Sequence, residues 1–199
     1  LKNIVPDISE QESSESVRFD EYWELKRRTL QAFQCSLMLK TLEDLSNKEE
    51  LTVVDVGDSA GTHMLYLRVL TKGRFTVDTI SVNLDPRAIE KIRRRGLKAI
   101  LCRAEDLEVE VDHVDLFTSF EMLEHLHNPS AFLRRLAKGT TCDRLLITVP
   151  YLRDSRVGLY QVRNQTKTPV FAEDEHIFEL DPDDWVLLMV HCGWKVVHQ

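Results

Sequence analysis

The sequence predicts an α/β fold: a doubly wound, mainly parallel sheet preceded by an N-terminal helical segment. Apolar runs of strand length alternate along the chain with segments of helical period. Three of the expected helices open on Asp-Pro or Asn-Pro and close on Gly, as helix ends commonly do. The first strand leads through a turn of small residues, Gly57 to Gly61, into a helix. Such alternation favours right-handed crossovers and a sheet covered by helices on both faces.

The N-terminal part of the chain differs from the rest. Residues 1–16 are polar and predict a loose lead-in, and a helical pattern runs from about residue 17 to residue 45. We assign its buried stripe to apolar residues spaced mostly three, four or seven apart: Trp23, Leu30, Phe33, Leu37 and Leu45. We therefore divide the chain into a lead-in and helical cap, residues 1–48, and a main domain, residues 49–199.

The main domain is expected to hold six strands, at Thr52–Val56, Val77–Val82, Lys98–Cys102, Val114–Ser119, Arg144–Val149 and Trp194–His198. Helices with paired start and stop signals are expected at Asp85 to Gly96, Asn128 to Gly139 and Asp181 to Gly193.

Composition excludes several classes of protein. The 199 residues suit one domain, and a formal net charge of -7 disfavours a general nucleic-acid binder. The four cysteines form no Cys-x-x-Cys pair, which favours free thiols and a cytoplasmic setting. No apolar run reaches the roughly 20 residues of a membrane span, so we expect no membrane association.

Polar and small residues gather where the strands end, which is where open α/β sheets bind ligands. Asp55 ends the first strand, and Asn83 stands at the end of the second, where nucleoside-binding folds often place an acid for the ribose hydroxyls. An amide can still accept from one hydroxyl and donate to another. Asp85, two residues on, has a simpler interpretation as a helix N-cap.

These landmarks together resemble the class I S-adenosylmethionine-dependent methyltransferases, and most closely the branch acting on small molecules. That branch has signatures similar to DVGCGxG, an acid on the second strand, AEDL and EVLEHL. The counterparts here are Asp55 to Gly61, Asn83, Ala104 to Leu107 and Glu121 to Leu126. The resemblance covers about residues 50–198 and implies a last antiparallel strand beyond Gln199, so we expect the sheet to lack it.

The resemblance implies S-adenosylmethionine as cofactor and S-adenosylhomocysteine as product. The positions that match the family's cofactor contacts are Asp55, Gly57, Ser59, Gly61, Asn83, Leu84, Ala104, Glu105, Ser119 and Phe120. Three positions depart from the pattern: Ser59 replaces a glycine, Asn83 replaces the acid, and Arg103 stands where many members have an aspartate. On this assignment we expect Gly61→Arg to abolish cofactor binding without unfolding the chain.

The acceptor side is expected above the fourth and fifth strands. His125 and His176 are the candidate bases there, since imidazole titrates near neutral pH. His113, flanked by Asp112 and Asp115, is not expected to bind a metal, because strand alternation would keep three such groups apart. The connection from 152 to 170, with the adjoining Tyr151, carries cationic and phenolic groups suited to an anionic or sugar-like acceptor: Tyr151, Arg153, Arg156, Tyr160, Arg163 and Lys167.

The leading hypothesis is methyl transfer to oxygen or nitrogen of a small-molecule acceptor. The alternative is a methyltransferase-like binding or scaffold domain whose altered pocket no longer turns over. A nicotinamide dehydrogenase is disfavoured, since the turn lacks three-glycine spacing. The N-terminal helix could also serve as a lid or as the contact of a homodimer.

Overall fold

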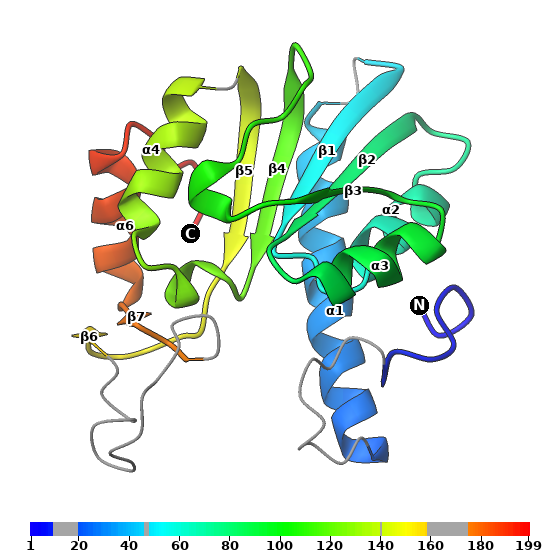
Figure 1. Ribbon diagram of the computed structural model, residues 1–199, viewed down its shortest axis with the longest axis horizontal. Helices are drawn as coiled ribbons and strands as arrows, with labels where there is room; N and C mark the ends of the chain where they lie inside the picture. Colours follow the sequence, from blue (N-terminus) through cyan, green and yellow to red (C-terminus); the bar gives the residue numbers. More distant parts are fainter. Residues whose placement is uncertain (10–19, 46–47, 140, 159–174) are drawn as a thin grey trace.

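The computed structural model describes residues 1–9, 20–45, 48–139, 141–158 and 175–199. Five parallel strands form one sheet in the order β3-β2-β1-β4-β5 (Figure 1). The strands are β1 (Glu50–Val56), β2 (Thr76–Asn83), β3 (Lys98–Leu101), β4 (Val114–Phe120) and β5 (Cys142–Thr148). The order reverses between β1 and β4, and ligands of such folds bind outside the carboxyl ends of the strands at this point.

Helices cover both faces of the sheet, which confirms the doubly wound architecture. One face carries α1 (Glu21–Glu43), α2 (Thr62–Leu70) and α3 (Pro86–Arg94), and the other carries α4 (Pro129–Gly139) and α6 (Pro182–His191). Two 3-10 turns follow β3 and β4, and a short hairpin follows β5: η2 (Ala104–Asp106), η3 (Leu123–His125), β6 (Arg156–Val157) and β7 (Phe178–Glu179).

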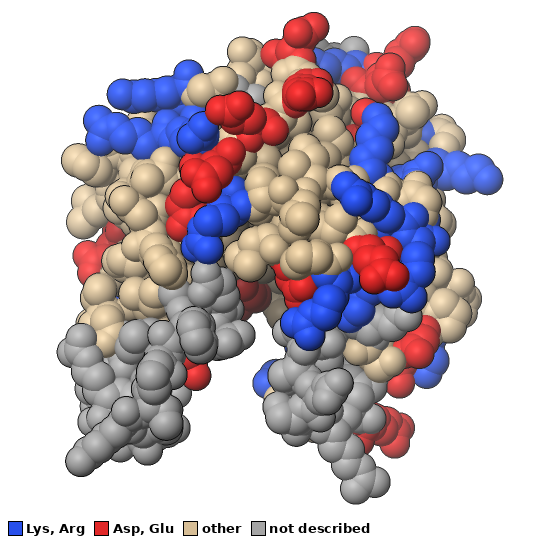
Figure 2. Space-filling model, in the orientation of Figure 1, with Lys and Arg blue, Asp and Glu red and all other residues tan. Residues whose placement is uncertain are grey.

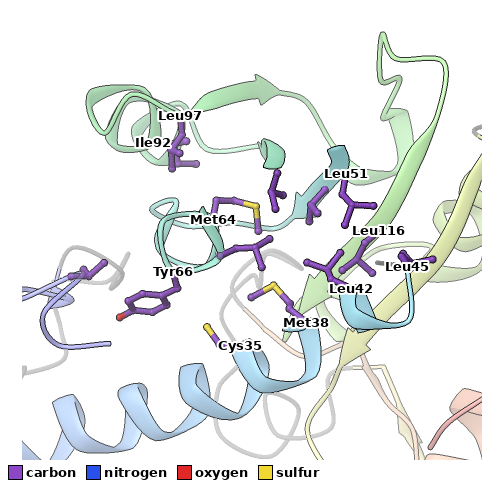
Figure 3. Close-up of a cluster of buried hydrophobic side chains, with 14 of the residues drawn as sticks. Cys35, Met38, Leu42, Leu45, Leu51, Met64, Tyr66, Ile92, Leu97 and Leu116 are labelled. Carbon is purple, nitrogen blue, oxygen red and sulfur yellow. The ribbon is translucent and has the colours of Figure 1, made fainter. Parts of the chain in front are cut away.

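The strand β1 is mostly apolar because both of its faces are covered. Leu51 and Val53 join the cluster formed with α1, α2 and α3 (Figure 3), whereas Val54 and Val56 join the cluster on the opposite face. Successive side chains alternate between faces, so a strand covered on both sides reads as one apolar run. By the same alternation Asp55 lies on the face of α1 and α2.

The predicted helix starts are confirmed by their hydrogen bonds. Asp85 Oδ1 accepts from the backbone N–H of Arg87 at 2.8 Å, and Asp181 Oδ1 accepts from that of Asp184 at 2.9 Å. Asn128 Oδ1 accepts from the N–H of Ala131 at 3.0 Å. Each cap satisfies a donor that the first helical turn leaves unpaired, so Asp85 is a helix cap as well as a strand-end residue.

The predicted stripe of α1 is wrong in part. The error lies at Phe33, which is 54% exposed; Leu45 is buried as expected, and Trp23, Leu30 and Leu37 are half-buried. The buried residues within α1 are Gln31, Gln34, Cys35, Met38 and Leu42. Two glutamines bury because α2 supplies partners: Tyr66 Oη donates to Gln31 Oε1 at 3.0 Å, and Gln34 bonds to the ring of His63. A buried amide with partners is stable, and apolar periodicity does not detect it.

Two further expectations fail. Residues Trp194–His198 form no strand, and the Trp194 indole N–H instead donates to the carbonyl of Leu133 on α4 at 3.0 Å. The first nine residues are not loose, since Val5 and Ile8 are buried and Arg28 Nη1 donates to the carbonyl of Val5 at 2.9 Å.

In the described part of the chain, no helix is long and apolar enough to cross a membrane, and all four cysteines are free thiols.

Candidate functional site

The turn between β1 and α2 is built so tightly that two positions require glycine. Gly57 and Gly61 have φ of 95° and 75°, which side-chain-bearing residues rarely adopt. A Cβ on Gly57 would lie 2.7 Å from Cγ of Met122, in the loop after β4, so Gly57 lets the two loops approach closely. A Cβ on Gly61 would instead collide with Leu97, beyond the end of α3. Gly61 therefore faces the core, and Gly61→Arg should strain the backbone and displace Leu97, which argues against the expectation that this variant stays folded.

Asp58 holds this turn from inside. Its Oδ1 accepts from the N–H groups of Ala60 at 3.1 Å and Gly61 at 2.6 Å, and its Oδ2 accepts from Ser81 Oγ at 2.6 Å. Burial raises the pKa of Asp58 to about 6, with a further increase from the neighbouring Asp55 carboxylate. The sequence analysis did not single out Asp58, although an acidic residue among small residues before a helix indicates a side chain that accepts hydrogen bonds from the backbone of the turn.

Asp55 carries an unsatisfied carboxylate oxygen at the end of β1. The side chain is 2% exposed, and its Oδ1 accepts from Thr118 Oγ1 on β4 at 2.8 Å. Its Oδ2 is buried, finds no hydrogen-bond partner in the part of the chain that the structure describes, and lies 3.5 Å from Nδ1 of His63. A buried acceptor without a donor is costly, so this oxygen is suited to a donor that a ligand brings.

A row of polar groups continues from Asp55 to helix α1. His63 Nε2 lies 2.9 Å from Gln34 Oε1, and Gln34 Nε2 donates to Thr148 Oγ1, at the end of β5, at 3.1 Å. The His63 ring also meets the edge of Phe120, with centroids 4.9 Å apart. The row thus joins the carboxyl ends of β1, β4 and β5 to α1, and Gln34 is a residue that sequence patterns missed.

The strand β2 contributes Asn83 and Leu84. Asn83 Nδ2 donates to the carbonyl of Asp58 at 3.0 Å, and its Oδ1 accepts from the N–H of Asp85 at 2.8 Å. These bonds join the end of β2 to the glycine turn, and they leave the amide one hydrogen and one lone pair for a ligand. Leu84 is 44% exposed beside it, as an apolar surface that a flat ring could cover.

The turn η2 brings in Ala104 and Glu105. Ala104 is buried, and the carbonyl of Glu105 accepts from Arg135 Nη1 on α4 at 3.3 Å. Arg103 Nε lies 3.8 Å from Glu105 Oε2, so its cation pairs with this neighbouring acid. On β4, Ser119 is fully buried, and no described residue hydrogen-bonds to its Oγ.

Beyond Met122, the turn η3 meets the hairpin. Glu124 Oε1 lies 3.9 Å from Nε2 of both His125 and His176, and the two imidazole rings pack edge to face at 4.7 Å. Glu124 is 1% exposed, and burial raises its pKa to about 8, with Glu121 adding to the rise. The structure therefore brings the two predicted histidines together around an acid that the sequence analysis did not single out.

Other predicted groups lie elsewhere. His113, Asp115 and Asp143 do converge, contrary to expectation, because neighbouring strands β4 and β5 place them side by side. The Lys48 ammonium contacts both of these aspartates, which gives the cluster a structural explanation as an ion-pair network. Tyr151 and Arg153 are exposed, and Arg156 Nε lies 3.3 Å from Glu179 Oε2. The predicted acceptor groups Tyr160, Arg163 and Lys167 lie outside the described residues.

The residues at the carboxyl edge fit the nucleoside-sulfonium group that the sequence resemblance implies. The buried Asp55 Oδ2 lacks a donor, which the ammonium of a bound amino acid would supply. Ser119 Oγ, on the neighbouring strand, is a second buried polar atom without a partner. Asp55 and Ser119 would hold the amino-acid end, and Leu84 and Asn83 would face the nucleoside end.

Comparisons with known proteins agree with this description. A family model described as a methyltransferase domain matches residues 26–199. A candidate sarcosine dimethylglycine methyltransferase of Galdieria sulphuraria superposes with a TM-score of 0.61 at 13% identity, covering 82% of this chain and 59% of the other. A candidate methyltransferase of Bacillus halodurans gives 0.58 at 14% identity, covering 82% and 71%. The cyclase SpnF gives 0.57 at 13% identity, covering 79% and 58%. At such low identity, these superpositions show a shared fold and no more. No curated protein matches the sequence.

Proposed function

The chain belongs to the methyltransferase-domain family, the class I S-adenosylmethionine-dependent methyltransferases, and we propose that it methylates an oxygen or nitrogen atom of a small acceptor. The observation that carries the proposal is the buried Asp55 Oδ2 without a donor, beside a turn in which Gly57 admits no side chain. S-adenosylmethionine, when bound, supplies an electrophilic methyl group on a sulfonium. The chain's part is to orient it and to align the acceptor.

The polar groups after β4 support an acceptor site next to the cofactor. Met122 fills the space that a Cβ on Gly57 would need, and Glu124 and His125 follow within the same loop. The N–H of Ile177 donates to the carbonyl of Glu124 at 2.7 Å, which fixes the segment before β7 against η3. In Figure 1 the β6–β7 hairpin lies below the carboxyl ends of β4 and β5. His125 and His176 would thus face an acceptor bound at the carboxyl ends of these strands and could take its proton.

The charged surface supports a small anionic or hydroxyl-rich acceptor over nucleic acid. Figure 2 shows basic side chains over α3 that are interspersed with acidic ones. Arg87 pairs with Asp85 at 3.0 Å, and Lys98 Nζ lies 2.7 Å from Asp78 Oδ2. Paired charges of both signs give a weak net field, whereas nucleic-acid binding favours an unbroken basic surface.

The cofactor assignment predicts the effect of Asp55→Asn. This change keeps the acceptor for Thr118 Oγ1 but removes the negative charge from the orphaned oxygen, so the chain should fold. We expect S-adenosylhomocysteine to bind the unaltered chain at micromolar concentration and the variant about 10- to 100-fold more weakly. Isothermal titration calorimetry measures both. The matched control is Asp112→Asn, at an exposed acid on another loop, and equal weakening in both variants would contradict the assignment.

One observation favours a second candidate, a binding domain without turnover. The amide of Asn83, in the place of the usual acid, already has protein partners at both ends. Titration with S-adenosylmethionine, followed by a turnover assay with the same cofactor, separates the two functions. Binding accompanied by release of S-adenosylhomocysteine with a panel of hydroxylated, phosphorylated and amine acceptors supports the enzyme. Absence of binding at millimolar cofactor supports the scaffold.

A further inference from the structure

The group formed by Glu124, His125 and His176 has the chemistry of a metal site. Each residue offers one ligand atom, and these atoms all lie within 4.8 Å of one another. Two neutral imidazoles and one carboxylate are a common donor set for zinc and other first-row transition metals. Metal–ligand bonds of about 2.1 Å place neighbouring ligand atoms roughly 3 to 3.5 Å apart. The 3.9 Å from Glu124 Oε1 to each ring nitrogen is therefore within a small side-chain adjustment of that geometry.

Glu124 supplies an independent reason to expect a ligand. Its side chain is 1% exposed, and neither carboxylate oxygen has a hydrogen-bond partner among the described residues. A carboxyl group held out of water needs hydrogen-bond partners, and its ionised form needs a compensating positive charge as well. Two ring nitrogens lie 3.9 Å from its Oε1, and Glu121 adds negative charge rather than relieving it. A cation placed between Glu124 and the rings would satisfy this carboxylate.

The surroundings are arranged as around bound metals. His176 Nδ1 lies 3.4 Å from Glu179 Oε1, and Glu179 Oε2 lies 3.3 Å from Arg156 Nε. A carboxylate behind a histidine commonly fixes the ring so that its other nitrogen faces a metal. The 2.7 Å bond from Ile177 N–H to the carbonyl of Glu124 joins the two backbone segments that carry the ligands.

We propose that Glu124, His125 and His176 bind one divalent transition-metal ion at the carboxyl edge of the sheet. Three protein ligands leave coordination positions open, as in metal sites that bind a substrate oxygen. This last step rests on the proposed function: in a methyltransferase the ion would hold an oxygen of the acceptor and lower the pKa of its hydroxyl. The two imidazoles are then ligands rather than general bases, and the acceptor is an oxygen nucleophile.

Titration of the full chain, after treatment with a chelator, tests the site. We expect one equivalent of Zn²⁺ or Co²⁺ to bind, both more tightly than Mg²⁺, because imidazole favours transition metals. The Co²⁺ visible spectrum reports the ligands directly. His125→Ala and His176→Ala should each weaken binding about 100-fold or more. The matched control is His113→Ala, from the cluster that holds Lys48, and it should leave binding unchanged.

Thermal unfolding separates loss of the site from loss of the fold. Metal that binds only the folded chain raises its melting temperature. This rise should vanish in the His125 and His176 variants, whose melting temperatures without metal we expect to stay near that of the unaltered chain. No stoichiometric binding, or binding that survives both substitutions, would overturn the metal site. S-adenosylhomocysteine titrated into the same samples tests the cofactor assignment separately, since Asp55 and Gly57 are unchanged in them.

Discussion

At the scale of single residues, the site depends on buried polar atoms whose partners lie far away in sequence. Asp55 Oδ1 accepts a hydrogen bond from Thr118, 63 residues further along the chain, whereas its Oδ2 has no donor among the described residues. Both carboxylate oxygens of Asp58 accept hydrogen bonds, from two backbone N–H groups and from Ser81 Oγ. Asp55 is thus open to a ligand, whereas Asp58 serves the turn itself.

Asp58 predicts a measurable pH dependence of stability. Its pKa of about 6 in the folded chain exceeds the ordinary aspartate value of 3.8, so the folded chain retains a proton that the unfolded chain loses between these values. The free energy of unfolding therefore falls as pH rises from about 4 to 6 and stays lower above, by about 3 kcal/mol for a group this buried. Asp55 raises this pKa and His63 lowers it.

Asp58→Asn removes this titration while keeping an oxygen for Ala60 and Gly61. We expect the variant to be more stable than the unaltered chain at pH 7.5 and the advantage to shrink toward pH 4. Urea unfolding of both chains across this range measures the difference, in which the other carboxylates cancel. A difference independent of pH would mean that burial does not control this group.

Gly61 and Gly73 form a matched pair. Both have positive φ, at 75° and 82°, but a Cβ on Gly61 meets Leu97, whereas one on Gly73 meets nothing within 4 Å. We expect Gly73→Ala to cost about 1 kcal/mol of stability, from the backbone alone, and Gly61→Ala about 2 kcal/mol or more. Chemical denaturation measures both. Equal costs would show that Leu97 gives way and that Gly61 serves only the turn.

At the scale of elements, helix α1 is part of the site as well as of the core. Its Met38 and Leu42 pack under the sheet (Figure 3), while Gln34 reaches the ends of β1 and β5 through His63 and Thr148. In Figure 1 the helix extends past the carboxyl edge of the strands. The helix therefore ties the apolar core to the polar row beside Asp55.

The buried glutamines of α1 lead to an unusual prediction: replacing a buried polar side chain by an apolar one should destabilise the chain more than removing an exposed aromatic side chain. Gln34→Leu should cost about 1 to 3 kcal/mol, because it leaves His63 and Thr148 without a buried partner. Phe33→Ser, at a side chain 54% exposed, should cost less than about 0.5 kcal/mol. Denaturant unfolding of the two variants measures both losses of stability and shows which face of α1 contributes more. A larger loss for Phe33→Ser would restore the apolar stripe expected from periodicity.

At the scale of the whole molecule, sequence patterns predicted what local chemistry controls. Five strands and the Asp or Asn caps of α3, α4 and α6 were foreseen, because buried strands read as apolar runs and caps are local hydrogen bonds. The strand expected at Trp194–His198 was not found, since a strand also needs a partner and this run finds α4 instead. The Glu124 group was missed because its histidines meet only after β7 docks on η3.

The central claim is that S-adenosylmethionine seats at the carboxyl edge of the sheet, with Asp55 at its amino-acid end. A crystal structure of the chain grown with millimolar S-adenosylhomocysteine tests this most directly. The account predicts density for the ligand above the Gly57 turn, with its ammonium within hydrogen-bond distance of Asp55 Oδ2 and its nucleoside end toward Leu84 and Asn83. An edge filled by Met122 and its neighbours, with the ligand absent or bound elsewhere, would contradict it.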